Sequence, residues 1–119
     1  MELKPAIAML SALAHEGRLA TFRMLVQAGP EGIAAGEIAR RLEAPPNTLS
    51  ANLKVLTHAG LSSSRREGRS IIYSARYEQM TQLLGYLMED CCAGSPEICA
   101  PLAEVLARTA CCVPEPLHA

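Results

Sequence analysis

Apolar residues recur at the spacing of an α-helix, with one interruption, in the stretch AAGEIARRLEAPPNTLSANLKVLTHA. In its first part Ile38, Ala39 and Leu42 fall at i, i+1 and i+4, which places them on one face of a helix. The first residue of Pro45-Pro46 disfavours helical backbone at the residue before it, so this helix should end there. The second proline can open a new helix, because the first helical position needs no N–H. The pattern predicts two short helices joined by a tight turn.

The second of these helices has an apolar face and a polar face. Leu49, Leu53 and Leu56 recur at i, i+4 and i+7, so we expect them to pack inward. A solvated helix would normally carry Glu and Lys on its other face, whereas Asn and Ser suit base edges in the DNA major groove. An ordinary helical hairpin that is poor in charge would give the same pattern. The face that we expect to be exposed and to bind DNA consists of Asn47, Thr48, Ser50, Ala51, Asn52 and Lys54.

A change of period after Gly60 indicates a β-hairpin. The runs LSSSRR and IIYSA are typical of two short strands, with Gly68 at the turn between them. This is the wing of a winged helix-turn-helix, and Arg65, Arg66 and Arg69 cluster on it. Guanidinium groups there suit phosphates or a narrow minor groove, although arginine can also simply keep a hairpin soluble. Because the wing follows a helix with a groove-reading face, we expect all three arginines to bind DNA.

Three further helices are predicted, and two of them carry apolar stripes that need a partner. Residues 16–28 give a helix whose inward face is Leu19, Phe22, Leu25 and Val26. Residues 3–14 carry the stripe Leu3, Ile7, Leu10 and Ala14. Residues 77–89 carry the stripe Tyr77, Met80, Leu83, Leu84, Leu87 and Met88. One winged domain cannot cover both stripes, so we expect a homodimer that pairs them across a two-fold axis.

Composition fits one mainly α-helical domain with DNA as its partner. The chain has 119 residues, half of them hydrophobic, enough for a modest core. No apolar run approaches a membrane span and residues 1–13 lack the features of a signal peptide, so we expect a cytoplasmic protein without a membrane partner. The net charge of −1 conceals a basic block, because residues 34–76 carry seven basic and three acidic side chains. Such a local field suits DNA better than the total charge suggests.

All five cysteines lie after position 90, and an odd number fits working thiols better than a closed disulfide framework. Cys91, Cys92 and Cys99 surround a Gly-Ser-Pro turn, and Cys111 and Cys112 lie near the end. Cysteines can serve merely as small hydrophobic residues, but two Cys-Cys pairs in a short tail favour a site for a soft ion. We therefore expect residues 1–90 to form the DNA-binding and dimerisation domain and residues 91–119 an inducer-binding segment.

From about Leu10 to Tyr73 the chain resembles the ArsR/SmtB family of metal- and metalloid-responsive repressors. The resemblance is carried by ALAHEGRLATFRML, GEIARRLEAPPNTLSANLKVLTHAGL and REGRSIIY. The chain departs from the family at Ala51 and at Asn52, where a His is common. The resemblance implies a winged helix-turn-helix dimer that leaves double-stranded operator DNA when its inducer binds. The positions that match the family pattern are Ser50, Leu53, Lys54, Leu56, Gly60, Leu61, Gly68, Arg69 and Tyr73.

The family places its inducer site in several positions, and two of these are excluded by the sequence. Residues 37–41 lack the Cys-x-Cys pair of one arsenic site, and residues 77–89 lack the histidine of the zinc-type site. Some arsenic-responsive relatives carry their site near the C-terminus. Trivalent arsenic takes three thiolates, whereas structural zinc more typically shows C-x2-C pairs and a fourth ligand. We therefore predict As(III) or Sb(III) as inducer, bound by Cys91, Cys92 and Cys99, with Cys111 and Cys112 as weaker candidates.

Other functions remain open at this point. The same dimer could be switched by a disulfide among these cysteines, or could sense another soft metal ion. A phosphatase-like thiol enzyme would need an arginine six residues after its cysteine, and no cysteine of this chain has one. We therefore expect neither an enzyme nor an organic cofactor. A DNA-free interaction domain would be recognised by the lack of salt-dependent DNA binding.

Overall fold

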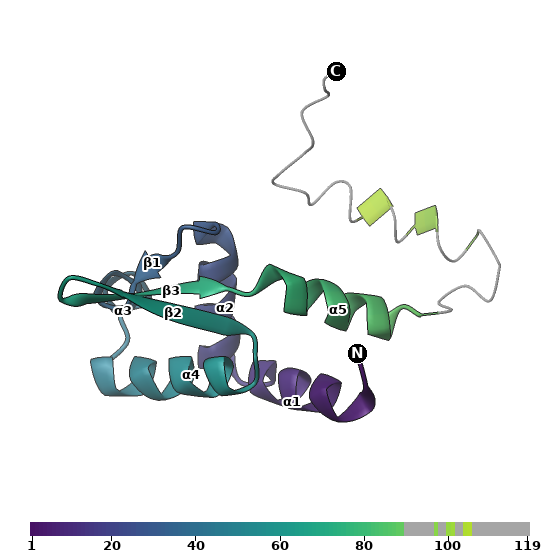
Figure 1. Cartoon of the computed structure of the whole chain (residues 1–119), viewed down its shortest axis with the longest axis horizontal. Coiled ribbons are helices and arrows are strands. Elements are labelled where there is room, and N and C mark those ends of the chain that lie inside the picture. Colours follow the sequence, from purple (N-terminus) through teal and green to yellow (C-terminus); the bar gives the residue numbers. More distant parts are fainter. Residues whose placement is uncertain (90–96, 98–99, 102–103, 106–119) are drawn as a thin grey trace, which may run out of the picture. The chain divides into compact units, whose positions relative to one another are not determined.

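The computed structural model describes residues 1–89, 97, 100, 101, 104 and 105. The chain divides into two units, Met1–Tyr86 and Leu87–Ala119. The described residues are mainly helical with a small antiparallel sheet, which confirms the predicted fold class (Figure 1). Their elements are α1 (Leu3–Leu13), α2 (Glu16–Ala28), β1 (Ile33–Ala34), α3 (Ala35–Leu42), α4 (Pro46–His58), β2 (Ser62–Glu67), β3 (Ser70–Ala75) and α5 (Tyr77–Leu87).

The core of the first unit lies where α2, α3 and α4 pack together. Burial of one such leucine or isoleucine contributes roughly 1.5–3 kcal/mol, so the inward face of α4 fixes that helix firmly on the body. The predicted inward leucines of α4 are confirmed. The buried side chains of this core include Phe22, Leu25, Ile38, Leu49, Leu53, Leu56 and Leu61.

The turn between α3 and α4 follows the prediction from the two prolines. Helix α3 ends at Leu42, and Glu43 adopts left-handed backbone with φ 52°. The N–H of Ala44 then donates to the carbonyl of Ala39 at 3.0 Å, which satisfies the helix end. Pro46 occupies the first position of α4. The two helices are therefore joined by three residues, as a helix-turn-helix requires.

The predicted wing is the antiparallel hairpin of β2 and β3. Its register runs from Ser62 opposite Ala75 to Glu67 opposite Ser70, which leaves a two-residue turn. Gly68 has φ 64° in that turn, a conformation that two-residue hairpin turns require and glycine adopts without strain. The position of Gly68 at the tip of the wing is confirmed.

A third strand was not predicted, so the description of a two-stranded sheet was incomplete. The sheet order is β1-β3-β2, and Ile33 of β1 lies opposite Tyr73 of β3. Two residues carry no alternation of apolar and polar positions, so β1 left no periodic signal. Its approach depends on Gly32, where a Cβ atom would lie 2.6 Å from the carbonyl oxygen of Tyr73.

The helix α1 buries the face opposite to the predicted stripe. Ala6, Met9 and Ala12 pack into the core, whereas Leu3, Ile7 and Leu10 are exposed. Small residues let α1 lie close to α2 and α4, which it contacts. Within the described residues Leu3, Ile7 and Leu10 are thus uncovered, as expected for a stripe that needs a partner.

The predicted stripe of α5 divides between two environments. Leu83 is only 2% exposed, and Met80 packs against the same core. Tyr77 is also partly buried, and its hydroxyl donates to the carbonyl of Val26 at 2.9 Å. Leu84 is 47% exposed. Only part of the stripe is therefore left for a partner.

The inward face predicted for α2 needs one correction. Phe22 and Leu25 are buried and Val26 is half-buried, as expected. Leu19 is 45% exposed, and Thr21 is buried instead. The Thr21 hydroxyl donates to the carbonyl of Gly17 at 2.8 Å, so this polar side chain is satisfied within the helix and can lie inside.

Candidate nucleic-acid interface

Helix α4 presents one small, hydrogen-bonding face to solvent. Five of the six side chains predicted to bind DNA are exposed on it, namely Asn47, Thr48, Ser50, Ala51 and Lys54. They are exposed because the leucines on the opposite side of α4 pack into the core. Amides and hydroxyls on such a face can reach base edges, and the lysine can neutralise a phosphate.

Asn52 does not belong to this face, so the prediction that its side chain is exposed there was wrong. It is only 8% exposed, and its Nδ2 atom would lie 2.9 Å from a Cβ atom placed on Gly17. The reason is helical spacing, since Asn52 follows Leu49 by three residues and precedes Leu56 by four. The side chain therefore packs α4 against the start of α2.

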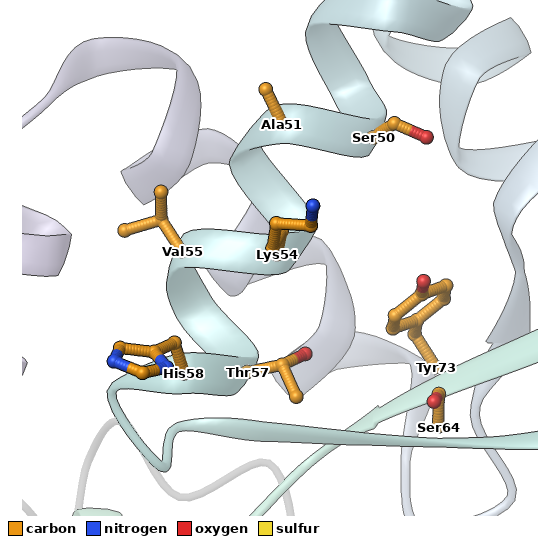
Figure 2. Close-up of a pocket in the computed structure, with 8 residues that line it drawn as sticks. All are labelled: Ser50, Ala51, Lys54, Val55, Thr57, His58, Ser64 and Tyr73. Atoms are coloured by element: carbon orange, nitrogen blue, oxygen red, sulfur yellow. The ribbon is translucent and has the colours of Figure 1, made fainter.

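A groove separates α4 from the wing, and we call it the wing-side groove. In Figure 2, Ser50 and Thr57 lie on the side of α4 that faces Tyr73 and Ser64. The Thr57 hydroxyl is also 2.8 Å from that of Ser62, which ties α4 to the base of the wing. The groove is lined by Ser50, Ala51, Lys54, Val55, Thr57, His58, Ser64 and Tyr73.

Four polar side chains of this groove had escaped prediction. Thr57 and His58 continue the exposed face of α4 one turn beyond Lys54, so helical spacing could have identified them. Ser64 and Tyr73 lie opposite each other on β2 and β3 and therefore share one face of the wing. That face could be identified only once the register was known, because a shift of one residue would turn both side chains away.

The same register separates two neighbouring arginines of the wing. Arg66 lies opposite Ile71, which places it on the face of Ser64 and Tyr73, toward the groove. Arg65 lies on the other face. Its Nε atom donates to Glu67 at 2.7 Å, and its Nη2 atom donates to the carbonyl of Glu31 at 2.8 Å.

The two other wing arginines keep their bonding capacity. Arg66 and Arg69 are exposed, and no ion pair or hydrogen bond engages their side chains within the described residues. Lys54 of α4 is likewise unpaired there. Lys54, Arg66 and Arg69 therefore keep charges that no described residue pairs, whereas Arg65 is bonded to Glu67 and to the carbonyl of Glu31.

The basic groups of α3 are partly neutralised within the helix. The carboxylate of Glu37 accepts hydrogen bonds from Arg40 and, at 2.7 Å, from Arg41. These bonds hold the pKa of the Glu37 carboxyl at about 2, well below its ordinary value. The positive field of the basic block therefore depends mostly on α4 and the wing.

All the cysteines predicted to bind the inducer, Cys91, Cys92, Cys99, Cys111 and Cys112, lie outside the described residues. Among the residues that are described, no cluster of three or more His, Cys, Asp or Glu side chains could hold a metal ion. Within the same described residues no helix is long and apolar enough to cross a membrane.

Comparison with known proteins gives consistent matches. A family model described as a helix-turn-helix domain matches residues 13–61. The HTH-type transcriptional regulator YceK of Bacillus subtilis is 35% identical over 77 residues, 64% of this chain and 76% of that protein. The transcriptional activator HlyU of Vibrio cholerae is 33% identical over 66% of this chain and 73% of its own length. The biofilm growth-associated repressor of Agrobacterium fabrum is 33% identical over 71% of this chain and 70% of its own length.

Solved structures agree on the fold. The superposition on the ArsR-like transcriptional regulator from Rhodococcus sp. RHA1 covers 89% of this chain and 93% of the Rhodococcus chain, with a TM-score of 0.65 at 24% identity. The superposition on HlyU from Vibrio cholerae covers 73% of this chain and 97% of the HlyU chain, with a TM-score of 0.58 at 33% identity. The superposition on the homodimeric winged helix-turn-helix DNA-binding domain Mb0332 from Mycobacterium bovis covers 71% of this chain and 76% of the Mb0332 chain, with a TM-score of 0.60 at 30% identity.

Proposed function

This chain belongs to the ArsR-like family of winged helix-turn-helix transcriptional regulators, and we propose that it is an operator-binding repressor released by a soft trivalent ion. The members of this family are DNA-binding regulators and not enzymes. What is proposed beyond the family is the direction of regulation, the dimer as the binding unit, and arsenic or antimony as the signal.

The observation that carries the proposal is the exposed face of α4 beside the wing. Ser50 and Thr57 offer hydroxyls along the wing-side groove, and Lys54 offers a charge. The helix with its side chains is about 10–12 Å wide, which matches a major groove about 12 Å wide. With α4 in the major groove, Arg66 and Arg69 at the end of the wing can reach the adjacent backbone or minor groove.

The relatives include both a repressor and an activator, and repression requires the simpler mechanism. The Agrobacterium relative is named a repressor and HlyU an activator. A dimer on an operator can block a promoter without contacting any other protein. Deleting the gene should therefore raise transcription from promoters that carry the operator.

A homodimer is supported by the uncovered apolar side chains of α1 and by the homodimeric relative Mb0332. Two copies related by a two-fold axis present two copies of α4. Such helices read two half-sites about one DNA turn, roughly 34 Å, apart. The operator should therefore be an inverted repeat.

The inducer proposal rests on the chemistry of the cysteines after α5. Cys91, Cys92 and Cys99 offer three thiolates and no histidine, the donor set that trivalent arsenic or antimony takes. Since α5 directly precedes them, closing three sulfurs on one ion can pull on the end of that helix. A coupling of about 1–3 kcal/mol would weaken DNA binding 5- to 150-fold.

Arsenite titration of a preformed complex with operator DNA, under reducing conditions, tests this proposal. Cys91→Ser, Cys92→Ser and Cys99→Ser should each keep operator affinity and lose release by arsenite, because two thiolates hold trivalent arsenic far less well. Cys111→Ser and Cys112→Ser serve as matched controls with weaker effects. Release of the Cys99→Ser complex at the wild-type arsenite concentration would contradict the assigned third ligand.

A redox switch is the second candidate. The relative HlyU has been solved in a form described as reduced, and five cysteines in this chain's tail could form disulfides. A redox sensor would release DNA on mild oxidation without arsenite and rebind it after thiol reduction. An arsenite sensor would instead respond while every thiol is kept reduced.

A further inference from the structure

A second groove lies on the other side of α4, between this helix, α1 and the start of α2. We call it the α1-side groove. It has a volume of about 560 Å³, and none of the residues that line it had been predicted to bind DNA except Lys54. Its lining consists of Ala8, Ser11, Ala12, Arg18, Lys54, Val55, His58 and Ala59.

The two grooves share the exposed ridge of α4. Lys54, Val55 and His58 line both of them. In Figure 2, Val55 and His58 point away from Tyr73 and Ser64, toward the side opposite the wing. The ridge therefore has a hollow along each flank, and the second hollow is continuous with the face assigned to DNA.

The α1-side groove is cationic. Arg18 and Lys54 line it beside His58, and no carboxylate of the described residues does. Arg18 is held in place, because its Nε atom donates to the carbonyl of Ala12 at 2.6 Å and its Nη2 atom to that of Ser11 at 3.4 Å. Its Nη1 atom donates to no acceptor within the described residues, so both N–H donors of Nη1 and one of Nη2 remain for a ligand.

The shape of the groove suits a chain that passes through it. Ala8, Ala12 and Ala59 form walls without long side chains, and the Ser11 hydroxyl lies on the rim. A helix that enters the major groove has one sugar-phosphate backbone along each flank, because the groove is bounded by both strands. The wing-side groove accounts for one strand, which leaves the other strand without an assigned partner.

We propose that the α1-side groove holds the phosphodiester backbone of the DNA strand opposite to the one at the wing. The inference rests on the proposed function, since it requires α4 to enter the major groove. Phosphates in it would be bound by Arg18, Lys54 and Ser11, with His58 at the ridge. These contacts carry no sequence information but fix the angle at which α4 lies in the groove.

Paired substitutions at the rim test this inference. Ser11→Glu places a carboxylate in the groove, and Ser11→Gln provides nearly the same volume without charge. Ser11→Glu should weaken binding to operator and to random duplex by the same factor, and should lower the slope of log affinity against log salt by about 1. Ala8→Glu and Ala8→Gln give a second pair one turn earlier on α1. Thermal melting shows which variants are folded.

Gln27→Glu is the control, because it makes the same charge change on an exposed site of α2 that lines neither groove. It should leave the salt slope unchanged. Ethylation interference should show two patches of essential phosphates on opposite strands, and Ser11→Glu should lose only the patch away from the wing. If folded Ser11→Glu and Ser11→Gln bind both duplexes equally, the inference is wrong.

Two other outcomes separate this inference from its alternatives. A wild-type protein with no salt-dependent DNA binding would remove the proposed function itself, and the inference with it. The groove could instead hold a small anion. Inorganic phosphate would then raise the melting temperature of the wild type but not of Ser11→Glu, while the salt slopes of the two proteins stayed equal, and this result would overturn the backbone assignment.

Discussion

Neighbouring arginines of the wing differ in how much bonding capacity they have left. A guanidinium has five N–H donors, and Arg65 directs two of its nitrogens at Glu67 and at the carbonyl of Glu31. Arg69 lies at the tip, exposed and without such partners in the described chain. The charge of Arg65 is paired with the carboxylate of Glu67 on the wing, whereas the charge of Arg69 is available to a phosphate.

Replacing each arginine by glutamine should therefore give different results. Arg69→Gln should weaken operator and random DNA alike and reduce the salt slope by about 0.9, the value for one lost phosphate contact. Arg65→Gln should leave the salt slope unchanged and lower the melting temperature slightly, because an exposed ion pair contributes about 0.2–1 kcal/mol. Equal losses of slope in the two variants would show that Arg65 also binds DNA.

Ser50 and Asn52 provide a second contrast on α4. Ser50→Ala should reduce the preference for operator over random duplex about fivefold, because one hydrogen bond contributes about 1 kcal/mol. Asn52→Ala should leave this preference unchanged and alter only the free energy of unfolding, because the side chain is buried. Competition binding against random duplex measures the first quantity and urea unfolding the second. A loss of preference in folded Asn52→Ala would return this residue to the DNA-binding face.

The sequence identified most of the exposed residues of α4 because this helix has strong periodicity. Leu49, Leu53 and Leu56 fixed the inward face, and the opposite face followed from it. Asn52 was misassigned because its polarity was given more weight than its position, although it lies on the leucine side. The separate roles of Arg65 and Arg66 could not be predicted, since they depend on a strand register that sequence periodicity does not determine.

The helix α3 provides a pH-dependent test. Bonds from Arg40 and Arg41 lower the pKa of Glu37 from 4.5 to about 2 in the folded chain. A lowered pKa stabilises the folded state above the unfolded value and loses this effect as the carboxylate is protonated. The contribution of Glu37 should thus be complete above about pH 5 and disappear as the pH falls toward about 2.

The measurement compares wild type with Glu37→Gln by urea unfolding between pH 2 and pH 7. The difference in unfolding free energy should be constant near neutrality and shrink through the acid range. Glu31→Gln, an exposed carboxylate whose side chain makes no ion pair in the described residues, is the matched control. A difference that stayed constant down to pH 2 would show that the α3 ion pairs are not formed in solution.

The elements themselves were largely predictable wherever local chemistry determines them. The two prolines set the turn between α3 and α4, and Gly68 set the tip of the wing. The strand β1 was missed because two residues carry no period, and its pairing with β3 depends on contacts distant in the chain. The stripe of α1 was predicted to need a partner and is exposed, whereas the inward face of the helix, which includes Ala6 and Ala12, was not named because alanines give a weak apolar signal.

Dimerisation should depend on the apolar side chains that the first unit leaves uncovered. Ile7 of α1 is 54% exposed and Leu84 of α5 is 47% exposed, so each can pack against a second copy. Leu83 cannot serve this purpose, because it is 2% exposed and part of the core. A charge at Leu83 would unfold the chain and say nothing about the interface.

Ile7→Glu combined with Leu84→Glu should therefore give a folded monomer. Burying two carboxylates in an apolar interface is costly, whereas both positions tolerate charge when exposed to water. The monomer can occupy only one half-site at a time, so operator affinity should fall by about 10²- to 10⁴-fold, the usual gain from linking two binding events.

Sedimentation equilibrium gives the oligomeric state of each protein. Titration with operators that carry one or two half-sites separates the affinity of a single α4 from the affinity gained by binding two half-sites together. Affinity for the single half-site should be equal in variant and wild-type protein. A wild-type chain that is monomeric at micromolar concentration and still prefers the two-site operator would contradict the dimer, and so would a variant that remains dimeric.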